Sequence, residues 1–305
     1  MIIKKKDNWF KMLFEWKGSV LPQLIPRLFL LFLFSFLVFY YKSFLLEYNL
    51  HINPAIFTLF GIALAIFLGF RNNVSYDRFW EGRKLWGALL NDSRSLARQS
   101  ITLLNSKENK AESQNFINLL IAFVYALKHQ LRDTDASEDL NRLLSSDFRD
   151  KLKDVHFKPI IILKELGLWV KKAKEEGKID GMAQLAFEEN LNKLSDIVGG
   201  CERIASTPIP YTYSVLLHRT VYIYCFMLPF GFVETLGWIT PFVIVFIAYT
   251  FVALEAIADE LEEPFGVQPN DLALDAMSLM IENTLLELNN QETIAKKTSN
   301  EYYIT

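Results

Sequence analysis

The seventeen residues from Pro54 to Phe70 carry no charge, and this stretch ends abruptly at Arg71. A stretch of this kind is typical of a membrane-spanning helix that is anchored by basic residues at the cytosolic face. Its second half has a bulky apolar residue at every fourth position, in the row Ile62, Ile66 and Phe70. Residues four apart share one side of a helix. The sequence therefore predicts a membrane helix with a distinct apolar row.

A second stripe, made of small residues, lies beside this row and consists of Gly61, Ala65 and Gly69. Small residues allow helices to approach one another closely in lipid. A bulky apolar row next to such a seam can line a hydrophobic constriction between neighbouring helices. In the alternative interpretation, both stripes simply meet lipid and neighbouring helices. Spacing by itself leaves both interpretations open.

Four apolar segments predict four membrane spans, at about 28–41, 54–70, 220–233 and 239–258. An apolar content of 51% agrees with a membrane protein. Basic residues crowd the N-terminus and the region after residue 70, whereas the connection 42–53 has one lysine and 234–238 has none. The positive-inside rule therefore places both termini and the long middle region in the cytosol.

The middle region, 71–214, has apolar residues at three- and four-residue spacing without sustained strand alternation, so it is predicted to be helical. The predicted helices are 75–104, 114–132, 138–152, 158–176 and 182–204. The apolar run 117–127 is expected to be a buried core helix, since it is too short to be a fifth span. Pro208 and Pro210 should end the last of these helices before the third span.

These segments divide the chain into four parts. Residues 1–70 hold an N-terminal helix and two spans, 71–214 a cytosolic helical region, 215–266 two further spans, and 267–305 a cytosolic C-terminal segment. In the first part, Trp9, Leu13 and Trp16 share one helical face among several lysines, in a pattern typical of an interfacial helix on the inner leaflet. The alternative is an amphipathic helix that packs on the protein itself. The predicted fold class is an all-α membrane protein.

No pattern of catalytic or metal-binding residues stands out. None of the four histidines pairs with another at metal-ligand spacing, and the chain has no HExxH, CxxC, GxSxG or phosphate-binding glycine motif. We therefore expect no enzyme activity, no cofactor and no bound metal. A net charge of −3 with scattered basic residues gives no indication of a nucleic-acid partner. Cys201 and Cys225 are expected to be small buried residues and not a disulfide pair.

Four sequence motifs occur in order along the chain: WKGS at 16–19, GFRNNVSYDRFWEGRKLWG at 69–87, CERIASTPIPYTY at 201–213 and ELEEPFG at 260–266. With these motifs the chain resembles a bacterial bestrophin over nearly its whole length. The resemblance implies a homopentameric ion channel in the bacterial inner membrane, with four transmembrane helices per protomer. The second helices would surround one axial pore that passes inorganic monovalent ions.

The resemblance also implies roles for particular residues. Ile62, Ile66 and Phe70 would form the apolar neck of the pore, roughly 12 Å long at the rise of an α-helix. Met182, or else Ile179, would form a second constriction at the cytosolic end. Animal members bind Ca²⁺ through an acidic run after the Pro-Phe-Gly motif. This chain has VQPND at 267–271, with one matching carboxylate, so we expect no calcium site.

Ion selectivity stays open at this stage. Animal relatives pass chloride and other anions, whereas some bacterial relatives favour monovalent cations such as Na⁺. Four acidic residues follow the fourth span, namely Asp259, Glu260, Glu262 and Glu263. They would favour cations if they faced the vestibule, or they could serve as structural ligands and helix-end partners.

Two other classes of protein compete with the channel. One is a membrane-anchored scaffold whose region 71–214 recruits a partner. The other is a coupled transporter, which would more often carry ionisable residues at the bilayer midplane, whereas Glu255 lies toward the inner end of the fourth span.

Overall fold

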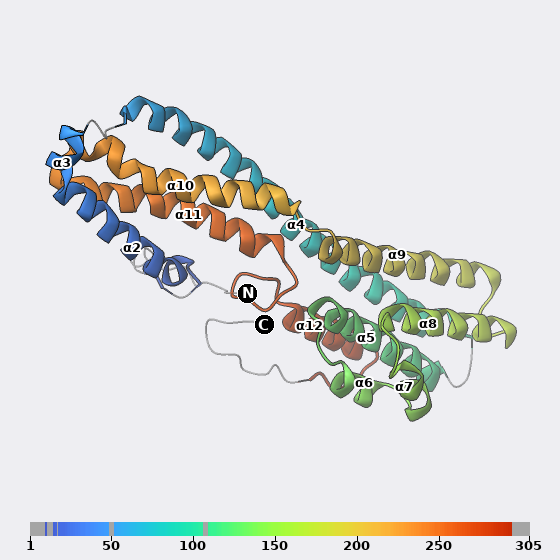
Figure 1. Ribbon diagram of the computed structural model, residues 1–305. Helices are drawn as coiled ribbons and strands as arrows, with labels where there is room; N and C mark the ends of the chain where they lie inside the picture. Colours follow the sequence, from blue (N-terminus) through green and yellow to red (C-terminus); the bar gives the residue numbers. More distant parts are fainter. Residues whose placement is uncertain (1–9, 11–14, 17, 49–51, 106–108, 295–305) are drawn as a thin grey trace. The chain divides into compact units, whose positions relative to one another are not determined.

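The structure is a computed structural model that describes residues 10, 15–16, 18–48, 52–105 and 109–294 of the chain. The described residues contain helices and no strand, in agreement with the predicted fold class. The helices are α2 (Leu21–Tyr40), α3 (Lys42–Glu47), α4 (Pro54–Thr102), α5 (Asn109–Arg132), α6 (Ser137–Leu143), α7 (Ser146–Leu152), α8 (Lys158–Glu175), α9 (Gly181–Ser206), α10 (Tyr211–Leu236), the short 3₁₀ helix η1 (Gly237–Ile239), α11 (Thr240–Glu262) and α12 (Leu274–Leu288) (Figure 1). The interfacial helix predicted around Trp9 and Leu13 lies outside the described residues.

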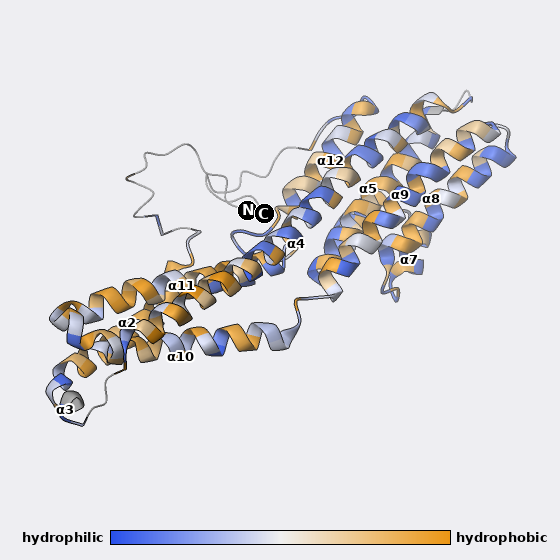
Figure 2. Cartoon of the chain, turned by 90° about the horizontal axis from the view of Figure 1, so that it is seen from above, coloured by the Kyte–Doolittle hydropathy of each residue, from blue (hydrophilic) through white to orange (hydrophobic). Residues whose placement is uncertain are grey.

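The helices form two compact units. The apolar unit comprises the described residues up to Phe79 and Pro208–Glu263, and the polar unit comprises the described residues of Trp80–Thr207 and those from Pro264 onward. Hydrophobic residues dominate α2, α10 and α11 of the apolar unit, whereas α5, α8, α9 and α12 of the polar unit mix both kinds (Figure 2). The chain passes between the units inside α4, so these boundaries differ from the predicted divisions, which follow membrane topology.

Three stretches of described helix are long and apolar enough to cross a membrane, namely Leu21–Tyr40, Pro54–Thr102 and Tyr211–Glu262. The last of these comprises α10, η1 and α11, and its two long helices pack against each other. Gly237 has a positive φ of 58° at the turn between them, and the Thr240 hydroxyl donates to its carbonyl oxygen at 2.6 Å. The count of four spans stays a prediction that requires two crossings within this stretch.

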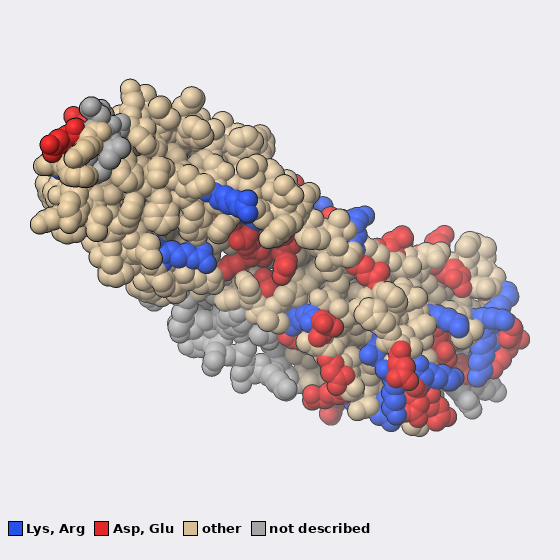
Figure 3. All heavy atoms as spheres, viewed as in Figure 1, with Lys and Arg blue, Asp and Glu red and all other residues tan. Residues whose placement is uncertain are grey.

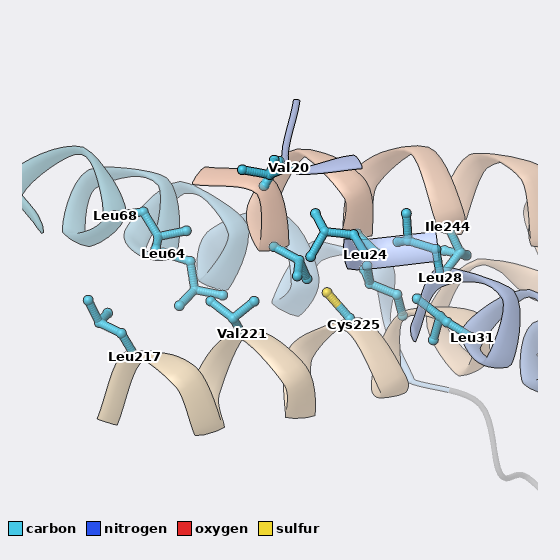
Figure 4. Packing of buried hydrophobic residues seen from close by; sticks show 14 of the residues in the cluster. Val20, Leu24, Leu28, Leu31, Leu64, Leu68, Leu217, Val221, Cys225 and Ile244 are labelled. Atoms are coloured by element: carbon cyan, nitrogen blue, oxygen red, sulfur yellow. The ribbon is translucent and has the colours of Figure 1, made fainter. Parts of the chain in front are cut away.

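The core of the apolar unit lies between α2, α4, α10 and α11. Leucines from α2 pack with apolar side chains of the other three helices in one buried cluster. Figure 4 shows Leu64 and Leu68 of α4 pointing toward Leu217 and Val221 of α10. Cys225 belongs to the same cluster as a free, buried thiol, as expected from the sequence. One face of α4 is therefore buried against the other helices of its own chain.

Helix α4 is continuous over 49 residues, whereas the sequence suggested separate helices at 54–70 and 75–104. Residues 71–74 contain neither glycine nor proline, so nothing interrupts the backbone hydrogen bonds there. The Asn72 side chain instead donates to the Leu68 carbonyl oxygen one turn earlier, at 2.9 Å. Pro208 and Pro210 act as predicted, since α9 ends at Ser206 and α10 begins at Tyr211.

The polar unit is built around α5, whose run 117–127 is buried except at the half-buried Asn118, as predicted for a core helix. Its packing partners include α8, α6 and α12. The single helix expected at 138–152 is two helices, α6 and α7, because the backbone is extended at Leu144 and Ser145. Helix α12 is not among the predicted helices, although its buried residues at 274, 278, 281 and 285 follow helical spacing.

An ionic cluster joins α12 to α5 and α6 within the polar unit. Lys128 of α5 contacts Asp139 at 3.3 Å and Asp275 at 3.0 Å, and Arg132 contacts Asp275 at 2.6 Å. Burial raises the pKa of both carboxyls, but their hydrogen bonds and ion pairs outweigh this effect and leave each pKa below its usual value. The partners of Asp139 are His129 and Lys128. The partners of Asp275 are Lys128 and Arg132. The carboxylates therefore stay ionised and hold α12 at neutral pH.

Candidate functional site

The apolar row of α4 is exposed in the isolated chain. Ile62 is 56% exposed, Ile66 52% and Phe70 61%. On another face of the same helix Leu64 and Leu68 are almost completely buried. An exposed row of large apolar side chains is normal on a membrane helix, where it meets lipid or another protein surface. The row is thus available to a partner outside its own chain.

Hydrogen bonds from the neighbouring helices fix the rotation of α4. The Tyr224 hydroxyl of α10 donates to the Phe57 carbonyl oxygen at 3.1 Å, and the Tyr213 hydroxyl donates to the Phe67 carbonyl oxygen at 3.3 Å. From α4 itself, the Asn72 amide donates to the Leu254 carbonyl oxygen of α11 at 3.0 Å. These contacts cover much of the length of the span. They hold the apolar row in a fixed direction.

The stripe of small residues does not act as one continuous seam within the chain. A Cβ atom on Gly61 would lie 2.6 Å from the Tyr224 hydroxyl, so α4 and α10 approach closely there. Gly69 has no heavy atom within 4 Å of the corresponding position, and Ala65 is exposed. One end of the stripe therefore serves packing inside the chain, and the other end is open.

Arg71, directly after the apolar row, is buried and neutralised. Its side chain is 2% exposed and pairs with the Asp259 carboxylate, and its Nη2 lies 3.6 Å from Glu262 Oε2. The other oxygen of Glu262 accepts a hydrogen bond from the Ile209 backbone N–H at 2.9 Å. The sequence suggested a basic anchor at the cytosolic face, and the burial of this guanidinium was not foreseen. Two of the four acidic residues after the fourth span thus act as structural partners.

The two candidates for the cytosolic constriction differ sharply in exposure. Met182 is 75% exposed in the first turn of α9, whereas Ile179 is 3% exposed and buried. Asp180 caps this helix by accepting from the Ala183 N–H at 2.7 Å. Lys178 contacts Glu176 at 2.5 Å, which ties down the preceding turn. Met182 is the candidate whose side chain is free to line an opening.

The loop after the Pro-Phe-Gly motif uses its carboxylate locally. Asp271 is buried and accepts a hydrogen bond from the Gln268 N–H at 2.7 Å. Among the residues that the structure describes, no group of three histidine, cysteine or acidic side chains is placed to hold a metal ion. The absence of a calcium or other metal site stays a prediction.

The helical architecture and the apolar spans define an all-α membrane protein. A family model described as "Bacterial/Fungal Bestrophin protein" matches residues 1–287. The chain therefore belongs to the bestrophin family, and the resemblance inferred from its four motifs is confirmed.

Individual relatives agree with this family. The chain is 49% identical over 288 residues to the voltage-dependent anion channel-forming protein RSc3414 of Ralstonia nicotianae, covering 94% of each chain. It is 40% identical over 297 residues to the voltage-dependent anion channel-forming protein YneE of Escherichia coli, covering 97% of each. A solved structure of a bacterial bestrophin homolog from Klebsiella pneumoniae is similar to this fold with a TM-score of 0.85 and 40% identity, over 88% of this chain and 99% of that one.

Proposed function

We propose that the protein is a homopentameric ion channel in which α4 helices from five protomers surround one axial pore. Ile62, Ile66 and Phe70 form its neck, and Met182 forms the cytosolic constriction. The proposal includes four spans per protomer, both termini in the cytosol and a place in the bacterial inner membrane. Relatives at 49% and 40% identity are named as anion channel-forming proteins. Those names also agree with the prediction that the chain is not an enzyme.

The observation that carries the proposal is the exposure of the neck row. Three large apolar side chains at four-residue spacing are between 52% and 61% exposed on a helix whose other face is held by α10 and α11. A ring of such rows from several copies would enclose a narrow apolar passage. A passage of this kind can empty of water when narrow and conduct ions when wider.

We propose that the conducted ions are monovalent anions such as chloride, in line with the relatives' names. An uncharged neck does not distinguish ions by sign, so selectivity must come from charges elsewhere along the pore. Asp259 and Glu262 are both paired with Arg71, whose one positive charge compensates one of their two negative charges. This pairing weakens the argument for cations such as Na⁺, which remain the alternative.

The test is a planar-bilayer recording of the full-length protein under asymmetric NaCl, with the variant Phe70→Ala. A reversal potential near the Cl⁻ equilibrium value supports an anion channel, and a value near that of Na⁺ supports a cation channel. Truncating the aromatic ring at a constriction should raise the single-channel conductance. Phe246→Ala is a matched control, because Phe246 is 72% exposed on α11 and is not part of the row.

Two outcomes would count against the proposal. If Phe70→Ala and Phe246→Ala change the conductance equally, the row does not line the pore. If neither the natural protein nor Phe70→Ala carries current, the membrane-anchored scaffold becomes the better explanation. Saturable exchange in place of a linear current–voltage relation would instead indicate a coupled transporter.

A further inference from the structure

An apolar cavity of about 150 Å³ lies between α2, α10 and α11 of the apolar unit. Its walls come from leucines of α2 and from Cys225, Phe226, Ala248 and Val252. Arg27 and Leu30 also line the cavity and are exposed, so it reaches the surface of the unit. A dry apolar cavity of about this volume is large enough to hold a small hydrocarbon. On a membrane-spanning unit, the hydrocarbon within reach is a lipid acyl chain.

The positively charged side chain of Arg27 lines this cavity. Arg27 Nη1 donates a hydrogen bond to the Tyr222 hydroxyl at 2.8 Å, which joins α2 to α10 directly over the apolar walls. Tyr222 is a neutral partner, and within the described part of the chain no carboxylate lies at ion-pair distance from Arg27. The buried Glu255 of α11 is paired with His218 at 2.6 Å, so the guanidinium of Arg27 still has N–H groups to donate.

A second cation is close to the same level of α10. Arg219 is exposed and precedes Tyr222 by three residues, which places both on the same side of the helix. The visible face of the apolar unit carries few Lys or Arg side chains, whereas charges of both signs cover the polar unit (Figure 3). Positive charge is thus sparse on this face of the apolar unit, and Arg27 places part of the unit's positive charge beside the cavity between α2, α10 and α11.

We propose that this cavity is a binding site for an anionic phospholipid. One acyl chain enters between α2, α10 and α11, and the phosphate group receives hydrogen bonds from Arg27, with Arg219 adding positive charge. Basic pockets between membrane helices near the cytosolic side suit such headgroups. Arg27 lies in the second turn of α2, at the end of the helix that the positive-inside rule assigns to the cytosol. The site therefore faces the inner leaflet and does not depend on ion conduction.

The test is native mass spectrometry of the full-length protein released from detergent. It is titrated with phosphatidylglycerol or with phosphatidylcholine carrying identical acyl chains. One arginine near a lipid headgroup contributes about a fivefold preference for the anionic lipid. We expect the natural protein to bind phosphatidylglycerol about fivefold more tightly than phosphatidylcholine. Arg27→Gln should remove most of that preference. It should weaken phosphatidylcholine binding less, because that lipid has the same phosphate group but no net charge.

Two further variants separate the parts of the site. Lys42→Gln removes one positive charge just beyond the far end of α2 and should leave the preference intact. Cys225→Leu places additional side-chain atoms in the cavity and should weaken the binding of both lipids. If that variant does not fold, Arg27→Gln and Lys42→Gln still decide the question. Glycerophosphoglycerol, which has the headgroup without acyl chains, should not compete.

Several results would overturn the proposal. They are equal affinity of the natural protein for both lipids, an equal loss of preference in Arg27→Gln and Lys42→Gln, or full competition by glycerophosphoglycerol. Unchanged binding in a folded Cys225→Leu protein would also exclude the cavity as the acyl-chain site. A side chain from a second copy filling the cavity would produce this last result.

Discussion

Replacing Arg71 with methionine should destabilise the apolar unit strongly, because it removes the cation at the centre of a buried ionic contact. The Arg71 side chain is 2% exposed and is shared by Asp259 and Glu262. Breaking a buried ion pair by removing one partner costs about 3–5 kcal/mol, since the other charge is left uncompensated. Asp259 is 61% exposed, so water can solvate it after the change. Glu262 is 13% exposed and keeps the Ile209 N–H as a partner.

These residual contacts place the expected loss at the lower end, about 3 kcal/mol. Such a loss corresponds to a fall in Tm of about 6–12 °C for a domain of 150–250 residues, and the smaller apolar unit should show a fall of at least this size. Thermal unfolding of the purified protein in detergent measures it. Asp259→Asn removes the exposed partner and leaves Glu262 to compensate the buried guanidinium, so it should cost clearly less than Arg71→Met. Adding Glu262→Gln to Arg71→Met should recover part of the stability, because the least exposed carboxylate then no longer carries a charge.

The reasoning is wrong if Arg71→Met melts within about 2 °C of the natural protein, which would amount to less than about 1 kcal/mol. It is also wrong if Asp259→Asn is equally damaging. The first result would mean that water reaches the guanidinium and that its burial has little energetic weight. The second would mean that the buried guanidinium depends on Asp259 and that Glu262 alone does not compensate its charge.

Two further predictions concern packing and pH. Gly231→Ala should destabilise the apolar unit by about 1–3 kcal/mol, because its Cβ would lie 2.3 Å from the Phe57 ring; Gly199→Ala, with no atom within 4 Å, should not lower the Tm. The pKa values of Asp139 and Asp275 are lowered in the folded protein, so their stabilisation is present at neutral pH and is lost as the pH falls below about 4. Asp275→Asn should be less stable at neutral pH and should lose less stability on acidification, as measured by hydrogen exchange of α12.

Most helices could be predicted because their cause is local. The uncharged run before Arg71, the prolines at 208 and 210 and the apolar spacing of the middle region each leave a direct pattern in the sequence. The break between α6 and α7 has no such pattern, since Leu144 and Ser145 are compatible with a helix and tertiary packing decides their extended backbone. Helix α12 does follow helical spacing, and an apolar periodicity count extended past residue 270 would have found it.

The same distinction between local patterns and long-range contacts applies to the candidate site. Regular spacing identified Ile62, Ile66 and Phe70 as one row, and the structure places all three on an exposed face. The burial of Arg71 could not be foreseen, because its partners come from α11, almost 190 residues further along the chain. A long-range ion pair leaves no periodic signal in a single sequence. The cavity beside Arg27 depends in the same way on the packing of α2 against α10 and α11, which lie far along the chain from it.

Because α4 is continuous, the direction of each side chain around the helix is fixed relative to the neck row. Each residue in an α-helix turns the chain by about 100°, so one insertion or deletion between Arg71 and Phe79 would redirect every later side chain of α4 relative to the neck row. A seven-residue insertion would preserve the facing to within about 20°. Changes in length should therefore accumulate in the connections between helices, and α4 should behave as a segment of fixed length.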